Sequence, residues 1–185
     1  MEKLLLVGAG GFGRVVLEHA EKEYECAFVD DSGIKEVNGT EVIGKISDIK
    51  NLYGKYKKLI VTIGNNRLRG NIYQVAEKIG YSFPNIIASS AYISPYAEIG
   101  NGCVVLNNVV IQNNSKIGNG VLLNPGVELH QDCVIGNNVL IYSNTVVRSL
   151  AKVGDRAHIG STLTISNGVF IPEDSKIDDG VTVRK

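Results

Sequence analysis

The 185-residue sequence has no excess of charge of either sign and no long apolar run. Its 19 Lys and Arg residues are balanced by 19 Asp and Glu residues. Because nucleic-acid binding relies on clustered positive charge, this balance gives no support for a nucleic-acid partner. The opening segment 1–8 holds only a short apolar stretch before its glycine, too short for a signal peptide or a membrane span. We therefore expect a cytoplasmic protein without a membrane partner.

Cysteine and histidine are also scarce, with three of each. Cys103 and Cys133 lie among small and aliphatic residues, and Cys26 lies in an apolar strand pattern. All three are therefore interpreted as small core residues, and a disulfide framework is not expected.

A six-residue repeat runs without insertion from residue 91 to residue 185. Its third position is always aliphatic, its first is small or aliphatic, and Gly, Asn or Asp crowd the last three, as in Gly118-Asn-Gly120. Such a short period indicates stacked units, each too small to bury its apolar side alone. One strand per hexad and three strands per coil predict a left-handed parallel β-helix. An antiparallel sandwich would instead need strands every 8–12 residues or so and variable loops.

The second hexad positions point outward and fall on three faces, because residues 18 apart stack at about 4.8 Å. One face is apolar over three coils, at Val104, Leu122 and Leu140. This stripe is larger than a monomer usually exposes. We therefore predict that it and part of the second face are buried in a homotrimer, with the third face mostly in water.

Residues 1–84 follow a different pattern and are expected to form a separate domain from residues 85–185. Apolar strand patterns alternate with amphipathic helical ones, which predicts a small parallel sheet. The predicted strands are residues 3–7, 25–29 and 58–63, and the predicted helices are residues 14–22 and 68–79.

A glycine pattern, Gly8-x-Gly10-x-x-Gly13, lies between the first strand and the first helix. Such glycines let a diphosphate approach backbone N–H groups at a helix N-terminus. Asp30 follows about 20 residues later at a strand end, where a ribose-binding acid would stand. A dinucleotide site is normally built from two βαβαβ units, and the hexads begin before a second unit could form. The pattern favours a nucleotide over NAD, with a tight turn that binds no ligand as the alternative.

Over nearly its whole length the chain resembles the sugar acyltransferases of the sialic acid O-acetyltransferase and bacillosamine/perosamine N-acetyltransferase family. The resemblance rests on the glycine loop, Phe28-Val-Asp-Asp31, residues 63–74 and the hexads. It implies an α/β half-Rossmann unit that binds a nucleotide-linked amino sugar, UDP-linked in the first instance. It also implies acetyl-CoA along a β-helix, between the subunits of a trimer. The substrate-binding residues that it implies are Gly8, Gly10, Gly11, Gly13, Asp30, Asp31, Asn65 and Arg69.

The implied chemistry is attack of a sugar amine or hydroxyl on the acetyl-CoA thioester, in surface glycan synthesis, with a histidine removing the proton. The family's base position is Gln131 in this chain, with His130 one place earlier, and its second histidine position is Leu140. The catalytic candidates are therefore His130 and, one coil beyond Leu140, His158. Asn124 keeps the polar place that the family has near the site.

Two functions stay open from the sequence. One is an acetyl-CoA-dependent nucleotide-sugar acetyltransferase. The other is a homologue that binds the nucleotide sugar and trimerises without transferring acetyl groups, because Gln131 cannot act as a base near neutral pH. His130 would then be a solvated turn residue, and His158 a surface or interface residue. A β-helix carbonic anhydrase would need three histidine ligands, but only two histidines lie in the repeat, so no metal site is expected.

Overall fold

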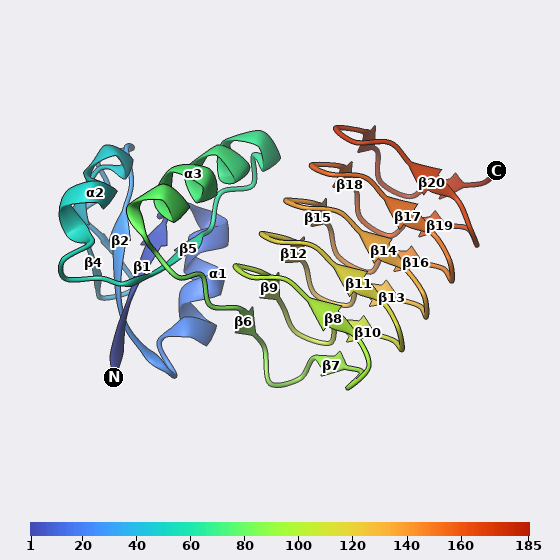
Figure 1. The fold of residues 1–185 in the computed structure, drawn as a ribbon, viewed down its shortest axis with the longest axis horizontal. Coiled ribbons are helices and arrows are strands. Elements are labelled where there is room, and N and C mark those ends of the chain that lie inside the picture. Colours follow the sequence, from blue (N-terminus) through green and yellow to red (C-terminus); the bar gives the residue numbers. More distant parts are fainter. The chain divides into compact units, whose positions relative to one another are not determined.

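The computed structural model describes residues 1–185, which form two compact units, Met1–Ile86 and Ile87–Lys185 (Figure 1). No helix in either unit combines the length and the apolar character that crossing a bilayer requires. The two units are built by different rules and are described separately.

The first unit contains a five-stranded sheet with strand order β3-β4-β2-β1-β5. Its strands are β1 (Glu2–Val7), β2 (Tyr24–Val29), β3 (Glu36–Val37), β4 (Thr40–Gly44) and β5 (Lys58–Val61). All neighbouring pairs are parallel except β3 and β4, which pair antiparallel at one edge. The predicted small parallel sheet is confirmed, and its three predicted strands are β1, β2 and β5. Because β1 lies between β2 and β5, its side chains are fully buried from Leu4 to Val7.

The helices of this unit are α1 (Gly11–Ala20), η1 (Ile46–Asp48), α2 (Ile49–Leu52) and α3 (Asn66–Ile79). Helix α1 begins three residues earlier than predicted, because Gly10 is its N-cap and the glycine loop runs straight into the helix. Asn65 is the N-cap of helix α3, and its side-chain oxygen accepts the Leu68 N–H at 2.9 Å. The C-cap is Gly80 with φ 108°, a left-handed conformation that glycine adopts without a steric penalty.

The second unit is a parallel β-helix of three sheets, with strands two residues long. The first sheet consists of β6 (Ile86–Ile87), β9 (Val104–Val105), β12 (Leu122–Leu123), β15 (Leu140–Ile141), β18 (His158–Ile159) and β21 (Lys176–Ile177). The second consists of β7 (Tyr92–Ile93), β10 (Val110–Ile111), β13 (Glu128–Leu129), β16 (Val146–Val147), β19 (Thr164–Ile165) and β22 (Thr182–Val183). The third consists of β8 (Glu98–Ile99), β11 (Lys116–Ile117), β14 (Val134–Ile135), β17 (Lys152–Val153) and β20 (Phe170–Ile171). Residues 18 apart are paired in register throughout, as predicted.

The corners between the sheets depend on the sixth hexad position, which has positive φ at every repeat from residue 102 to residue 180. Most of these positions are Gly, Asn or Asp, which tolerate the left-handed region. The exceptions are Leu150, Arg156 and Thr162. Arg156 bonds to Asp174 and Thr162 to a neighbouring carbonyl, but Leu150 is 60% exposed at φ 64°.

Polar side chains at the first hexad position point into the β-helix and bond to corner carbonyl groups. Each donates to the carbonyl of the fourth position in a later hexad, 15 residues further on. The four bonds run from Cys103 to Gly118, from Ser115 to His130, from Cys133 to Arg148 and from Thr145 to Gly160. Each of these carbonyls thereby gains a donor from inside the β-helix, which stabilises the corner. None of the three cysteines forms a disulfide.

The apolar stripe on the first sheet is not exposed. Val104 and Leu122 are fully buried and Leu140 is 2% exposed in the single chain. The three side chains are thus buried within the chain, and the predicted homotrimer stays a prediction. On the third sheet the charged side chains of Glu98, Lys116 and Lys152 are exposed, as predicted.

Candidate active site

His130 lies where strand β13 ends, at the corner between the second and third sheets. Its N–H donates to the Val147 carbonyl at 2.9 Å, and its carbonyl accepts the Ser115 hydroxyl at 2.8 Å. The backbone is thus fixed from the coils on both sides, while 28% of the side chain is accessible. The imidazole Nε2 lies 3.7 Å from a carboxylate oxygen of Glu128. A fixed, accessible imidazole beside a carboxylate is an arrangement suited to general base catalysis.

The residue at the family's base position, Gln131, is exposed at the same corner. Its amide cannot remove a proton near neutral pH. Asp132 follows with φ 61°, so the chain turns sharply immediately after Gln131. Of His130 and Gln131, His130 is therefore the one whose side chain can act as a base at neutral pH.

His158 lies on the first sheet, where it is paired in register with Leu140 and Lys176. Its ring centroid is 5.2 Å from that of Tyr142. A cavity of about 500 Å³ opens here. The lining residues are Tyr142, His158, Gly160, Ser161, Lys176, Ile177, Asp178 and Asp179. This lining combines an aromatic face with groups of both charges, so it can hold a polar ligand with a flat ring.

The structure does not bring His130 and His158 together within one chain. In a three-sided coil, each corner lies opposite one sheet. His130 occupies the corner between the second and third sheets, which lies opposite the first sheet, and His158 is on that first sheet. Asn124 lies at another corner, between the first and second sheets, and its amide donates to the Ile141 carbonyl at 3.2 Å. The three predicted catalytic residues therefore face different directions in a single subunit.

In the first unit, two of the loop glycines are required by the fold itself. Gly8 has φ 111°, and a Cβ there would lie 2.8 Å from the Ile63 side chain. A Cβ at Gly13 would overlap the carbonyl oxygen of Gly8. These two glycines allow α1 to pack directly against the end of β1, so they need no ligand to explain them.

Gly10 and Gly11 are different, because a Cβ at either would meet no atom within 4 Å and neither has positive φ. Gly64, after β5, has the same properties. Because β1 and β5 are adjacent parallel strands, their carboxyl ends lie at the same edge of the sheet. The three glycines leave open space beside the N-terminus of α1, where backbone N–H groups and the helix dipole favour an anion. Gly64 was not among the predicted binding residues, although its place soon after a buried strand is a usable signal in the sequence.

The two acidic residues after β2 hold the loops at this edge. One carboxylate oxygen of Asp30 accepts the Ala9 N–H at 2.7 Å, and the other accepts the N–H and the hydroxyl of Ser32. Partial burial alone would raise the pKa of Asp30, but the bonds from Ser32 and Ala9 lower it below its ordinary value. Asp31 accepts the N–H of Ile46 at 3.0 Å. Both carboxylates thus shape the loops around the open space.

Asn65 and Arg69 also have structural partners. Asn65 caps α3, as described above. Arg69 is fully buried, and its guanidinium donates to the Ile63 carbonyl at 2.7 Å and to the Asn66 side-chain oxygen at 2.8 Å. Arg69 therefore fixes the loop between β5 and α3 and offers no exposed surface to a ligand in this structure.

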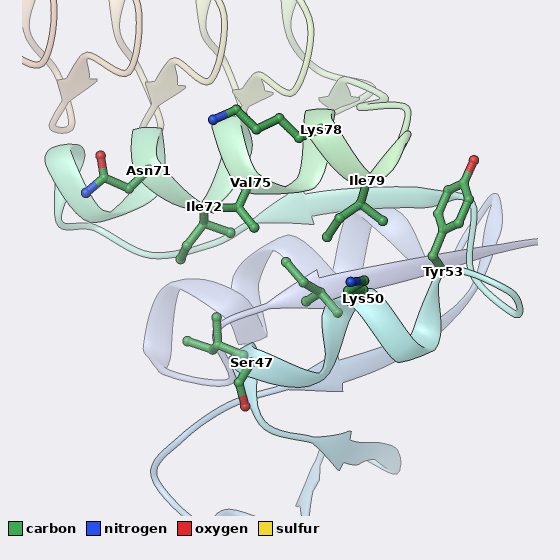
Figure 2. Close-up of a pocket in the computed structure, with 10 residues that line it drawn as sticks. Ser47, Lys50, Tyr53, Asn71, Ile72, Val75, Lys78 and Ile79 are labelled. Atoms are coloured by element: carbon green, nitrogen blue, oxygen red, sulfur yellow. The ribbon is translucent and has the colours of Figure 1, made fainter.

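A larger cavity, of about 860 Å³, lies in the first unit between α3 and the segment formed by η1 and α2 (Figure 2). Ile72 and Ile79 point from α3 towards α2, while Lys78 extends away from the gap. No carboxylate, imidazole or thiol is among the residues that line it. This cavity therefore lacks the groups for acid–base chemistry at neutral pH that His130 provides in the second unit.

Comparison with known proteins decides the family. Residues 3–76 match the PglD N-terminal domain, and residues 87–185, more than half of the chain, match the GMPPB C-terminal domain. The acetyltransferase domain of PglB from Neisseria gonorrhoeae, in complex with acetyl coenzyme A, is 31% identical with a TM-score of 0.89. The match covers 98% of this chain and 95% of that one. The chain belongs to the hexapeptide-repeat sugar N-acetyltransferase family.

PerB from Caulobacter crescentus, in complex with CoA and GDP-perosamine, is 28% identical with a TM-score of 0.94, over 100% of this chain and 90% of that one. These matches confirm the predicted fold class, an α/β half-Rossmann unit followed by a left-handed parallel β-helix. A curated relative, an uncharacterized protein of Acanthamoeba polyphaga mimivirus, is 32% identical over 119 residues. The match covers 62% of this chain, which spans only 23% of the length of that relative.

Proposed function

We propose that this protein is an acetyltransferase that transfers the acetyl group of acetyl-CoA to a nucleotide-linked sugar. The observation that carries the proposal is the match with PglB and PerB, which extends over both units at TM-scores of 0.89 and 0.94. PglB was solved with acetyl-CoA, and PerB with CoA and a nucleotide sugar. Acetyl-CoA is accordingly the co-substrate.

The nucleotide sugar binds at the first unit, with its diphosphate over Gly10, Gly11 and Gly64 at the N-terminus of α1. The open space at these glycines supports this placement, since nothing inside the chain requires glycine there. Asp30 and Asp31 shape the loops beside it. The resemblance in sequence favours a UDP-linked amino sugar, and the ligand of PerB makes a GDP-linked sugar the second choice.

Acetyl transfer uses His130 as the general base. The sugar amine or hydroxyl attacks the thioester carbonyl, the new C–N or C–O bond forms, and His130 takes the proton of the nucleophile. The C–S bond then breaks, and CoA leaves as a thiolate that recovers a proton. Because His158 and Asn124 face away from His130 in one subunit, they join the same site only if a second copy supplies them. We therefore propose a homotrimer with acetyl-CoA between subunits, in which Asn124 and His158 contact the co-substrate.

The reaction takes place in the cytoplasm and serves surface glycan synthesis. The cysteine content agrees with this compartment, because none of the three thiols is oxidised to a disulfide and disulfides are rare in the cytosol.

A second candidate is a homologue that binds the nucleotide sugar and trimerises without transferring acetyl groups. The observation in its favour is that both family histidine positions are occupied by residues without acid–base chemistry, the exposed Gln131 and the buried Leu140. It predicts that acetyl-CoA does not bind.

Thiol release from acetyl-CoA in the presence of UDP- and GDP-linked amino sugars tests the first candidate, with His130→Ala and, in helix α1, His19→Ala as matched variants. We expect release by the wild type and by His19→Ala, and at least a hundredfold less by His130→Ala. Absence of release at high enzyme concentration, together with calorimetric binding of nucleotide sugar but not of acetyl-CoA, would establish the second candidate instead.

A further inference from the structure

Glu128 is the one charged side chain in the outward row of the second sheet. This second-sheet row consists of Tyr92, Val110, Glu128, Val146 and the threonines Thr164 and Thr182. Glu128 is paired in register with Val110 on one side and with Val146 on the other. Both valines are half-buried and uncharged, and the row contains no cation. The Glu128 carboxylate therefore has no neutralising partner within its own row. On the third sheet, by contrast, Glu98 is paired with Lys116 of the next coil at 3.3 Å.

The side-chain contact that Glu128 does form is with His130. Residues two apart on a strand point to the same side, so Glu128 and His130 both face outward, with Leu129 buried between them. The distance of 3.7 Å between Nε2 and the carboxylate is slightly too long for a hydrogen bond. Because 51% of the Glu128 side chain and 28% of the His130 side chain are accessible, a small rotation of either side chain can bring the two groups to hydrogen-bond distance.

We infer that Glu128 is a positioning residue that holds the His130 ring for proton transfer, an inference that rests on the proposed function. The carboxylate accepts the Nε2–H of the neutral imidazole, which leaves the lone pair on Nδ1 to take the proton of the sugar amine or hydroxyl. When Nδ1 is protonated, the positive charge formed on the ring lies beside the negative charge of Glu128. The chain thereby uses a carboxylate two residues before the base.

The competing carboxylate is Asp132, which follows the family's base position. It lies beyond Gln131 in a left-handed turn, whereas the carboxylate that the structure pairs with His130 is that of Glu128. Arg148 occupies the same corner position as His130 one coil further on. Replacement of either acid by its amide keeps the size of the side chain and removes only its charge, so the two variants form a matched pair.

The test compares Glu128→Gln with Asp132→Asn in the full-length protein. For Glu128→Gln we expect kcat to fall about 3- to 5-fold, the effect of a partly exposed charge pair formed when His130 takes the proton, with KM unchanged for both substrates. Asp132→Asn should change kcat less than twofold. An unchanged kcat in Glu128→Gln, or an equal or larger loss in Asp132→Asn, would overturn the inference.

Nitrogen-15 NMR of the imidazole rings gives a readout without activity, and the chain has only three histidines to assign. In the neutral ring of the wild type, we expect the Nδ1 of His130 to show the shift of an unprotonated nitrogen. In Glu128→Gln both nitrogens should move towards averaged values, while His19 and His158 stay unchanged. If the wild type transfers no acetyl group, the proposed function fails, yet this spectrum still decides whether Glu128 orients His130. Identical spectra of His130 in the two proteins would refute the inference.

Discussion

Replacement of Gly13 by alanine should destabilise the first unit, although alanine is the better helix former. The gain in helix propensity is about 1 kcal/mol. Against it, the new methyl group would overlap the carbonyl oxygen of Gly8 and lie 3.2 Å from Thr62 Oγ1. The obstruction is backbone, so α1 must shift relative to β1, at a cost of about 2–3 kcal/mol. A net loss of about 1–2 kcal/mol in a domain of this size lowers Tm by roughly 5–15 °C.

Thermal unfolding followed by circular dichroism at the helical band reports on this unit, because every helix of the chain lies in it. The matched control is Gly11→Ala, where the methyl group meets no atom within 4 Å. This control should unfold at or slightly above the wild-type temperature but bind nucleotide sugar less tightly, since the methyl group would occupy the proposed diphosphate space. If Gly13→Ala melts with the wild type, or if both variants lose stability equally, the packing argument for the loop is refuted.

Three further predictions concern the rest of the chain. Ser115→Ala leaves the His130 carbonyl without its donor and should lower the free energy of unfolding by about 1–3 kcal/mol in urea titrations; an unchanged midpoint would contradict this. Because hydrogen bonds depress the pKa of Asp30, its ionised form stabilises the fold above the unfolded-state pKa of about 3.9, and that contribution disappears as the pH falls through the lower folded-state pKa. The wild type should therefore lose more stability than Asp30→Asn on acidification below about pH 4. Leu150→Asn should raise stability by about 0.5–1 kcal/mol by relieving the left-handed leucine, whereas a loss would indicate that neighbouring subunits cover this side chain.

The repeat made the second unit predictable from sequence alone. A period of six residues fixes which side chains point inward, and three hexads per coil fix the register, so the pairing of Leu122 with Leu140 follows from counting. The start of α1 was less predictable, because a glycine-rich segment has low helix propensity and its conformation here is set by packing of Gly13 against Gly8. The burial of Leu140 was predicted, but the sequence could not show that it is already nearly complete in the single chain, since an outward direction on a strand does not say what lies over it.

The sequence was sufficient to predict which residues belong to the candidate site, but not which of their side chains contact one another. The sequence identified His130, and strand alternation places Glu128 on the same side, yet only the distance between the two side chains singles out this carboxylate over Asp132. The bond from Ser115 to the carbonyl of His130 joins residues 15 apart, a separation that matches no simple strand or helix period. Likewise, Arg69 looks from its sequence context like a substrate contact, and only its complete burial shows that it braces a loop.

The in-register stacking of the coils also limits how this protein can change in length. Duplication of a single hexad would preserve the buried core, but it would rotate every later residue to the next side of the prism and separate His158 from its present neighbours. Duplication of 18 residues would leave both the core and the columns intact. Insertions and deletions that arise in the β-helix should therefore survive as whole coils, whereas single residues can be added only where they bulge outward from a corner.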